Sequence, residues 1–341
     1  MHRFTLPLLA LFALLSAGCL PNRIVLDLAP GDGTLEETAL LSDPGTTRRS
    51  PKVAMIDVVG LITFAPDAGF FTGGNVLDRI VARLAKAEGD PDVVAVILRI
   101  NSPGGTVAAS EALYDEIASF SDRSGKPVVI SMAELATSGG YYVALAGDHI
   151  VAQPATITGS IGVLVQTFNF SRGMNKIGIE GRAVVSGPNK AITNPFEPPV
   201  EEHYALTQEL VDEYYETFRG LVATRRPDMA EDARTFDMVT DGRVFTGARA
   251  RTLGLIDEVG SVHDAFDSAK TLADVPDAHL VKYHAKGAQP ASVYSVDAGT
   301  VDRFMFGPGE QNIEVSLLDL DMPSSGGVDA GFYYLWLPAR R

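Results

Sequence analysis

Cysteine is almost absent from this sequence: Cys19 is the only one in 341 residues. A single cysteine cannot form a disulfide within the chain, and it cannot build the multi-cysteine sites that hold structural zinc or iron–sulfur clusters. The sequence therefore excludes a disulfide-stapled fold and a cysteine-based metal centre.

Basic residues are also few, with 28 Lys plus Arg against 43 Asp plus Glu and a formal net charge of −15. Such an excess of anionic charge repels phosphate backbones, so we expect no nucleic-acid partner. Hydrophobic residues make up 46% of the chain and charged residues 21%, which is typical of a globular protein. The length allows one large or two medium domains.

The apolar N-terminal stretch, Phe4 to Leu15, is shorter than the run of about 20 residues that a transmembrane helix needs. Arg3 precedes it and small residues follow it, which is the pattern of a secretion signal. Because Cys19 comes directly after Ala17 and Gly18, the segment resembles the lipobox of bacterial lipoproteins. Ser16 departs from that motif, which usually has Leu at this position.

The resemblance to a lipobox implies that residues 1–18 are a lipoprotein signal peptide and that Cys19 becomes the acylated first residue. We then expect an exported, membrane-anchored lipoprotein that faces the periplasm or the cell exterior. An ordinary signal peptide cleaved near Ala17 is the alternative.

Composition divides the rest of the chain into three parts. Residues 19–52 are rich in Pro, Gly, Asp and Thr, and only Ile24 to Leu28 looks strand-like, so we expect a lipid-anchored tether. Residues 53–284 carry regular patterns, and residues 285–341 form a C-terminal extension of unknown role. The extension ends in the apolar run Phe332 to Leu337, which could pack as an edge strand or lie against a partner or membrane.

Within residues 53–284, short β-branched runs alternate with helical stretches, which indicates an α/β fold with a largely parallel sheet. The expected strands are Val53–Val59, Val93–Ile100, Pro127–Met132, Ile150–Pro154 and Ile157–Val165. The expected helices are Val76–Ala87, Ala108–Phe120, Gly139–Ala146, Phe168–Ile177, Pro199–Arg225, Thr246–Leu253 and Val262–Leu272. Apolar residues recur along one face of Pro199–Arg225, and we expect that face to be core.

Neither a histidine-based hydrolase nor a metal site is indicated. The sequence has no Gly-x-Ser-x-Gly motif, and no two histidines have the spacing of metal ligands on one helix face. We expect no metal and no other cofactor.

Two glycine-rich turns stand where a strand ends and a helix begins. The first is Asn101-Ser102-Pro103-Gly104-Gly105, and the second is Ser138-Gly139-Gly140-Tyr141-Tyr142. Backbone N–H groups at such junctions can hold an oxygen atom, and a serine there can develop an oxyanion nearby. Taken singly, the first is better explained as a tight βα turn and the second as an N-cap serine.

Together the two turns resemble those of the signal peptide peptidase A family, also called protease IV. Three further segments extend the resemblance: Thr158 to Val163, Ser186 to Lys190, and Asp241 to Gly247. The similarity covers about residues 53–271 and leaves out the tether and the C-terminal extension.

This resemblance implies the Clp-protease and crotonase type of fold, with repeated ββα-type units, for a peptidase domain at residues 53–284. It also implies a Ser-Lys dyad with Ser138 as nucleophile, Lys190 as general base and Ser160 as the hydroxyl that orients Lys190. The N–H groups of Gly104 and Gly139 would form the oxyanion hole.

The sequence around Lys190 suits a general base. An alkylammonium has an ordinary pKa of about 10.4, so a lysine base must be desolvated and kept away from carboxylates. Lys190 is the only charged residue between Arg182 and Glu197. An exposed loop lysine is the alternative.

The resemblance therefore predicts a secreted, membrane-anchored serine endopeptidase that hydrolyses extended or membrane-derived peptides, such as cleaved signal peptides, through an acyl-enzyme. Family members with one catalytic module share each dyad between adjacent subunits, so we expect a homo-oligomeric ring. Two alternatives stay open. One is a catalytically inactive peptide-binding or scaffolding member, and the other is an enzyme that acts on acyl thioesters, for which no CoA-binding feature is evident.

Overall fold

The computed structural model describes residues 34–66, 75–296 and 333–336. The predicted signal peptide, Cys19, the first part of the predicted tether and most of the C-terminal extension lie outside the described residues. Their predicted roles stay predictions.

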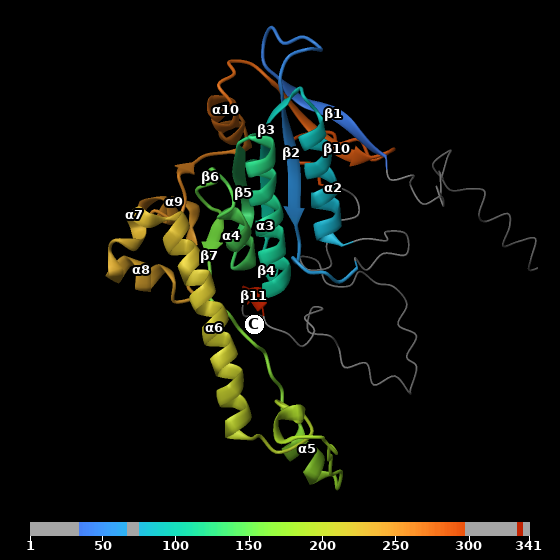
Figure 1. Cartoon of the computed structure of the whole chain (residues 1–341), viewed down its shortest axis with the longest axis vertical. Coiled ribbons are helices and arrows are strands. Elements are labelled where there is room, and N and C mark those ends of the chain that lie inside the picture. Colours follow the sequence, from blue (N-terminus) through green and yellow to red (C-terminus); the bar gives the residue numbers. More distant parts are fainter. Residues whose placement is uncertain (1–33, 67–74, 297–332, 337–341) are drawn as a thin grey trace, which may run out of the picture. The chain divides into compact units, whose positions relative to one another are not determined.

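The described residues form an α/β fold around a nine-stranded, mostly parallel sheet with the order β1-β10-β2-β3-β5-β6-β9 (Figure 1). Off this path, β7 pairs in parallel with β5 and antiparallel with β8. A separate antiparallel pair joins β11 to β4. The strands are β1 Leu35–Ser42, β2 Lys52–Val59, β3 Val93–Ser102, β4 Gly104–Thr106, β5 Val128–Thr137, β6 His149–Ala152, β7 Ile157–Gly159, β8 Val244–Thr246, β9 Glu258–Val259, β10 His279–Ala285 and β11 Tyr333–Leu335.

Helices follow most of these strands, as the alternating sequence pattern predicts. The helices are α2 Val76–Gly89, α3 Val107–Ser124, α4 Gly139–Ala144, α5 Ser171–Lys176, α6 Glu201–Arg225, α7 Pro227–Ala230, α8 Ala233–Val239, α9 Gly247–Thr252 and α10 Val262–Leu272, with a 3-10 turn η1 at Pro188–Ala191. The predicted α/β class and the Clp-type arrangement are confirmed.

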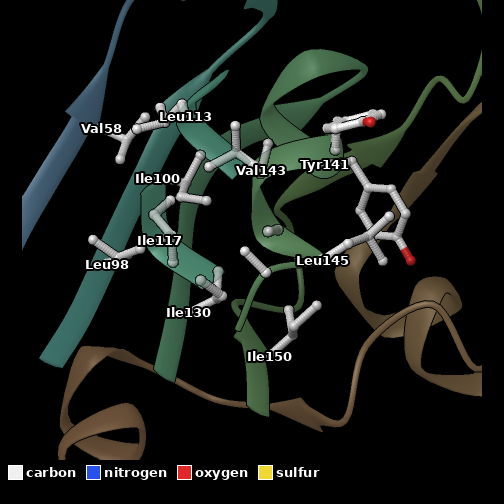
Figure 2. Close-up of a cluster of buried hydrophobic side chains, with 14 of the residues drawn as sticks. Val58, Leu98, Ile100, Leu113, Ile117, Ile130, Tyr141, Val143, Leu145 and Ile150 are labelled. Carbon is white, nitrogen blue, oxygen red and sulfur yellow. The ribbon is translucent and has the colours of Figure 1, made fainter. Parts of the chain in front are cut away.

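Both faces of the sheet are buried because its central strands are apolar at nearly every position. Alternate residues of β2 divide between two cores: Ala54, Ile56 and Val58 pack with α2, α3 and α4, whereas Val53 and Met55 pack with α10. Figure 2 shows the first core, with Leu98 and Ile100 of β3 gathered beside Leu113 and Ile117 of α3. A register slip by one residue would exchange these faces, so the two cores hold the register.

The expected tether is wrong in part, because β1 falls within residues 19–52. This strand pairs antiparallel with β10 from Leu35 opposite Ala285 to Ser42 opposite His279. Its partner is far away in the sequence, so composition near β1 does not reveal the strand. The apolar run near the C-terminus does pack as a short strand, β11, which was one of the two alternatives for it.

A buried cluster of charges attaches residues 293–295 to the sheet. Arg99 donates to both carboxylate oxygens of Asp57, at 2.8 and 2.9 Å, and Lys282 also donates to Asp57. Both cations donate in addition to the carbonyl of Ser295. Lys282 is only 1% exposed, so its charge depends on these partners.

A second ion pair joins the end of α6 to the sheet. Arg226 donates to Asp257 at 2.6 Å, and the N–H of Ile150 in β6 donates to the same carboxylate at 2.8 Å. Burial opposes ionisation of Asp257, but the hydrogen bonds and charge of Arg226 outweigh it and lower the pKa below 3.8.

We predict that Asp257→Asn lowers the free energy of unfolding at neutral pH by about 1–3 kcal/mol, because Arg226 loses its anionic partner. The depressed pKa makes this contribution present above the unfolded-state pKa and lost as pH falls through the folded-state pKa. Denaturant unfolding at several pH values measures it. Asp237→Asn removes the exposed pair with Arg219 and serves as the control, with a change below about 0.5 kcal/mol. A deficit independent of pH would contradict the role of the charge.

Candidate active site

Ser138 occupies a strained turn between β5 and α4. Its φ of 54° and ψ of −116° lie in a region that residues with a side chain rarely adopt. The Ser138 N–H donates to the carbonyl of Gly159 at 2.7 Å, and the Ser138 carbonyl accepts from the N–H of Tyr142 at 2.8 Å. The ends of β5 and β7 therefore impose the strained conformation.

The Ser138 hydroxyl is buried and makes no hydrogen bond to the described residues. The residue is 1% exposed, and its Oγ has no hydrogen-bond partner among the described residues. Although Ser138 stands at the N-cap of α4, its side chain makes no capping hydrogen bond. An unsatisfied buried hydroxyl is unfavourable, so the N-cap explanation does not account for this serine.

The two glycine turns come together, as predicted. β3 and β5 are parallel neighbours, with Ser102 opposite Ala136, so both turns follow the same edge of the sheet. Gly104 has a φ of 106°, and a Cβ on it would stand 2.7 Å from the backbone nitrogen of Gly139. Only glycine permits this approach.

The N–H of Gly104, one of the two predicted oxyanion donors, makes a hydrogen bond within its own turn. The N–H of Gly104 donates to the Oγ of Ser102 at 3.1 Å, and that hydroxyl donates to the carbonyl of Gly60 at 2.6 Å. The predicted donor on Gly104 is therefore used within its own turn. The backbone nitrogen of Gly105 lies 3.0 Å from the Cβ position of Gly139, which brings Gly105 to the same place.

Ser160 lies beside the Ser138 turn because β7 is the parallel neighbour of β5, with Gly159 opposite Thr137. Ser160 is buried, and its φ of 54° equals that of Ser138. Its N–H donates to the carbonyl of Arg243 at 2.8 Å, which ties the turn to β8. The ends of β5 and β7 thus carry two adjacent serines, both with positive φ angles.

Lys190 is not brought to Ser138 within the single chain. It lies in η1, where its side chain is exposed, and the Ser138 Oγ has no hydrogen-bond partner among the described residues. Ser138, Ser160, Gly104 and Gly139 therefore gather at one sheet edge, whereas Lys190 is exposed in η1 and makes no hydrogen bond to Ser138.

The segment that contains Lys190, residues 168–200, carries many exposed apolar side chains. Val184 is 99% exposed and Ile177 is 73% exposed, and in the first half of α6 Leu210 is exposed as well. The predicted core face of α6 is wrong in that half, because only Phe218 and Val222 of the helix are buried. The other exposed members are Phe168, Phe170, Ile179, Val185, Ile192, Phe196 and Val200.

Within the described ranges, no three or more His, Cys, Asp or Glu side chains gather in a way that could hold a metal ion. No helix among the described residues has the length and apolar character needed to cross a membrane.

Comparison with known families agrees with the geometry. The Clp protease model matches residues 72–158, a range that contains both glycine turns. The fold and the two glycine turns are therefore those of an α/β protease of the Clp type. The model of peptidase family S49 matches residues 121–276.

Individual relatives with similar sequences identify the family within this class. A candidate protease of Synechocystis sp. is 34% identical over 230 residues, which cover 67% of this chain and 77% of that protein. A candidate signal peptide peptidase SppA of Enterococcus faecium is 31% identical over 252 residues, covering 74% of this chain and 72% of the relative. The chain belongs to peptidase family S49, the signal peptide peptidase A or protease IV family, and is a protease.

Longer members of the family also match. Protease 4 of Salmonella typhi is 36% identical over 215 residues, which make up 62% of this chain but only 34% of that protein. The chain therefore corresponds to about a third of such a relative's length.

We predict that Gly104→Ala destabilises the fold by about 2–4 kcal/mol and removes most activity, because its Cβ would strain a positive φ and meet the Gly139 nitrogen. Denaturant unfolding and peptide hydrolysis measure the two effects. Gly89→Ala is the control, since nothing lies within 4 Å of its Cβ position. Equal stability and activity of the two variants would contradict the close packing of the turns.

Proposed function

We propose that the chain is a serine endopeptidase in which Ser138 is the nucleophile. The observation that carries this proposal is the buried, unpartnered hydroxyl of Ser138 in a strained turn. Ser138 Oγ would attack the peptide carbonyl while its proton moves to the Lys190 amine, and the amine would then protonate the leaving nitrogen. Water deprotonated by Lys190 would release the acyl group and restore Ser138.

The N–H groups of Gly139 and Gly105 would hold the oxyanion of each tetrahedral intermediate, because the Gly105 nitrogen lies 3.0 Å from the Cβ position of Gly139, the residue that follows Ser138. Ser160 would orient the Lys190 amine, since it lies at the end of β7 next to the Ser138 turn. Preorganised donors of this kind act where negative charge develops and need no rearrangement during the reaction.

We propose that Lys190 serves the Ser138 of a neighbouring subunit in a homo-oligomeric ring. Two observations support this. Lys190 is exposed within its own chain, and the surface around it carries apolar side chains that a single chain leaves in water. Packing this surface against a neighbour would bury the apolar side chains and desolvate the amine, which favours the neutral form that accepts a proton.

The substrates we propose are extended peptides, including membrane-derived fragments such as cleaved signal peptides. The relative from Enterococcus faecium, a candidate signal peptide peptidase, supports this choice. The N-terminal signal and the position of Cys19 support export and attachment to a membrane through a lipid on that residue.

A complementation experiment tests the shared dyad. We predict that Ser138→Ala and Lys190→Ala each lower kcat by about 1,000-fold or more while folding normally. Mixed subunits of the two variants should regain activity, because an intact Ser138 of one subunit then meets an intact Lys190 of the next. With equal mixing, about a quarter of the sites would be complete. Hydrolysis of a fluorogenic peptide measures the recovery.

Two controls accompany this experiment. Mixing Ser138→Ala with the double variant should stay inactive, and Lys176→Ala, which removes another exposed lysine from the same region, should stay active. If the mixed single variants assemble like the parent protein but show no activity, the shared dyad is wrong. If either single variant alone keeps full activity, the Ser-Lys mechanism is wrong.

Anchoring through Cys19 is tested separately. We predict that Cys19→Ser moves the protein from the membrane fraction to the soluble fraction of the producing cell, since the acylated residue is lost. Mass spectrometry of the mature N-terminus should show acyl groups on Cys19 in the parent. A parent protein without acyl groups that still sediments with membranes would contradict the anchor.

A further inference from the structure

A second hydroxyl without a partner lies directly before Ser138. Thr137 is the last residue of β5 and is 0% exposed, and its Oγ1 makes no hydrogen bond to the described residues. Among the residues that the structure describes, four buried side-chain nitrogen or oxygen atoms lack a partner, and two of them are these consecutive hydroxyls. Unsatisfied buried groups are rare in native proteins, so a pair of them at one turn indicates a site whose partner comes from elsewhere.

The strand that carries Thr137 does not explain its hydroxyl. Thr158, in the neighbouring strand β7, is equally buried, but its Oγ1 donates to the carbonyl of Ala136 at 2.7 Å. Valine has nearly the same shape as threonine, suits a buried strand and leaves no polar atom unsatisfied. Threonine at position 137 is therefore unfavourable for stability, and a role in the reaction would account for it.

The sheet register places Thr137 next to both serines of the candidate site. It lies opposite Gly159 of β7, whose carbonyl accepts the Ser138 N–H and which directly precedes Ser160 (Figure 1). Consecutive Cα atoms are about 3.8 Å apart and neighbouring strands about 4.8 Å apart, so these three hydroxyl side chains begin at adjoining backbone positions. An amine that reaches the Ser138 hydroxyl therefore arrives beside the other two residues.

The hydrogen-bonding groups of a lysine amine match three hydroxyls. A neutral amine has one lone pair and two N–H groups, and an ammonium has three N–H groups. In the proposed dyad, the lone pair of Lys190 takes the proton of Ser138, and Ser160 accepts one N–H. The remaining N–H needs an acceptor as well, because an unsatisfied donor in a buried site is unfavourable.

We infer that Thr137 is a positioning residue, whose hydroxyl accepts the remaining N–H of the Lys190 amine that a neighbouring subunit brings to Ser138. This inference rests on the proposed dyad shared between subunits. With Thr137 and Ser160 both accepting, the lone pair of the amine is directed at the Ser138 hydroxyl. After proton transfer, the ammonium donates to the Ser138 oxygen and to the same two hydroxyls, so the new positive charge is fully hydrogen-bonded.

Thr137→Val tests this role, because it removes the hydroxyl and keeps the shape of the side chain. We expect kcat for a fluorogenic peptide to fall by about tenfold or more with KM unchanged, since the amine and not the substrate loses a partner. The denaturant midpoint should stay equal or rise, since an unsatisfied polar atom is removed. Thr137→Ser restores a hydroxyl and should regain most of the parent kcat.

Thr38→Val is the matched control. Thr38 lies in the edge strand β1, and its hydroxyl is hydrogen-bonded to Nε2 of the buried His284 at 2.9 Å. This variant should lower the denaturant midpoint and leave kcat unchanged, which is the reverse of the result expected for Thr137→Val. An unchanged kcat in Thr137→Val would overturn the inference. A lower kcat accompanied by a lower midpoint would also overturn it, because loss of a structural contact gives that result.

Mixed subunits show on which side of the shared site Thr137 acts. In the sites regained by mixing Ser138→Ala with Lys190→Ala subunits, Ser138 comes from the Lys190→Ala subunit. Adding Thr137→Val to that subunit should lower the regained activity by the same factor as in the parent. Adding it to the Ser138→Ala subunit should change nothing, and equal losses from the two placements would overturn the inference.

Failure of this inference is distinguishable from failure of the proposed function. Loss of hydrolysis in Ser138→Ala together with a normal kcat in Thr137→Val would remove the role of Thr137 and leave Ser138 as the nucleophile. Assembled mixtures of Ser138→Ala and Lys190→Ala that regain no activity would remove the shared dyad and, with it, the arrangement around Thr137.

Discussion

Parallel pairing of β3, β5 and β7 is the constraint on which the candidate site depends. Parallel strands end at the same edge of a sheet, so the residues that follow them meet there: Gly104 after β3, Ser138 after β5 and Ser160 after β7. The two apolar cores on either side of the sheet hold the register of these strands. Packing far from Ser138 thereby decides which backbone groups surround its hydroxyl.

The strain at this edge is local and is supported from outside. Ser138 and Ser160 both have positive φ angles, and the Ser138 hydroxyl is buried without a partner. Such features persist only where the surroundings leave no alternative. Buried strands supply that support, since the end of β7 accepts the hydrogen bond from the Ser138 N–H through the carbonyl of Gly159.

The proposed shared dyad would also explain the exposed apolar side chains of residues 168–200, because a neighbouring subunit would cover them. The edge of β4 is covered within the chain itself, where β11 pairs with it and Tyr334 stacks on Tyr142.

Local patterns in the sequence were enough for most of the fold and for part of the site. Helix α10 has the predicted bounds, Val262–Leu272, because its apolar period and its N-cap are contained in its own residues. The buried strands β2 and β3 were likewise apparent from their β-branched runs. The motif resemblance predicted one site from Gly104, Gly139, Ser138 and Ser160, and their catalytic roles stay predictions.

Tertiary structure decided what depends on distant partners. The strand β1 forms because β10, more than two hundred residues later, supplies its hydrogen bonds, and no pattern near β1 predicts that pairing. Only the three-dimensional turn shows that the Gly104 N–H donates to the Ser102 hydroxyl and that the Gly105 nitrogen lies near the Cβ position of Gly139. The exposure of Lys190 and the pairing of β11 with β4 could not be predicted for the same reason. Spacing along the chain does not determine which surfaces come into contact.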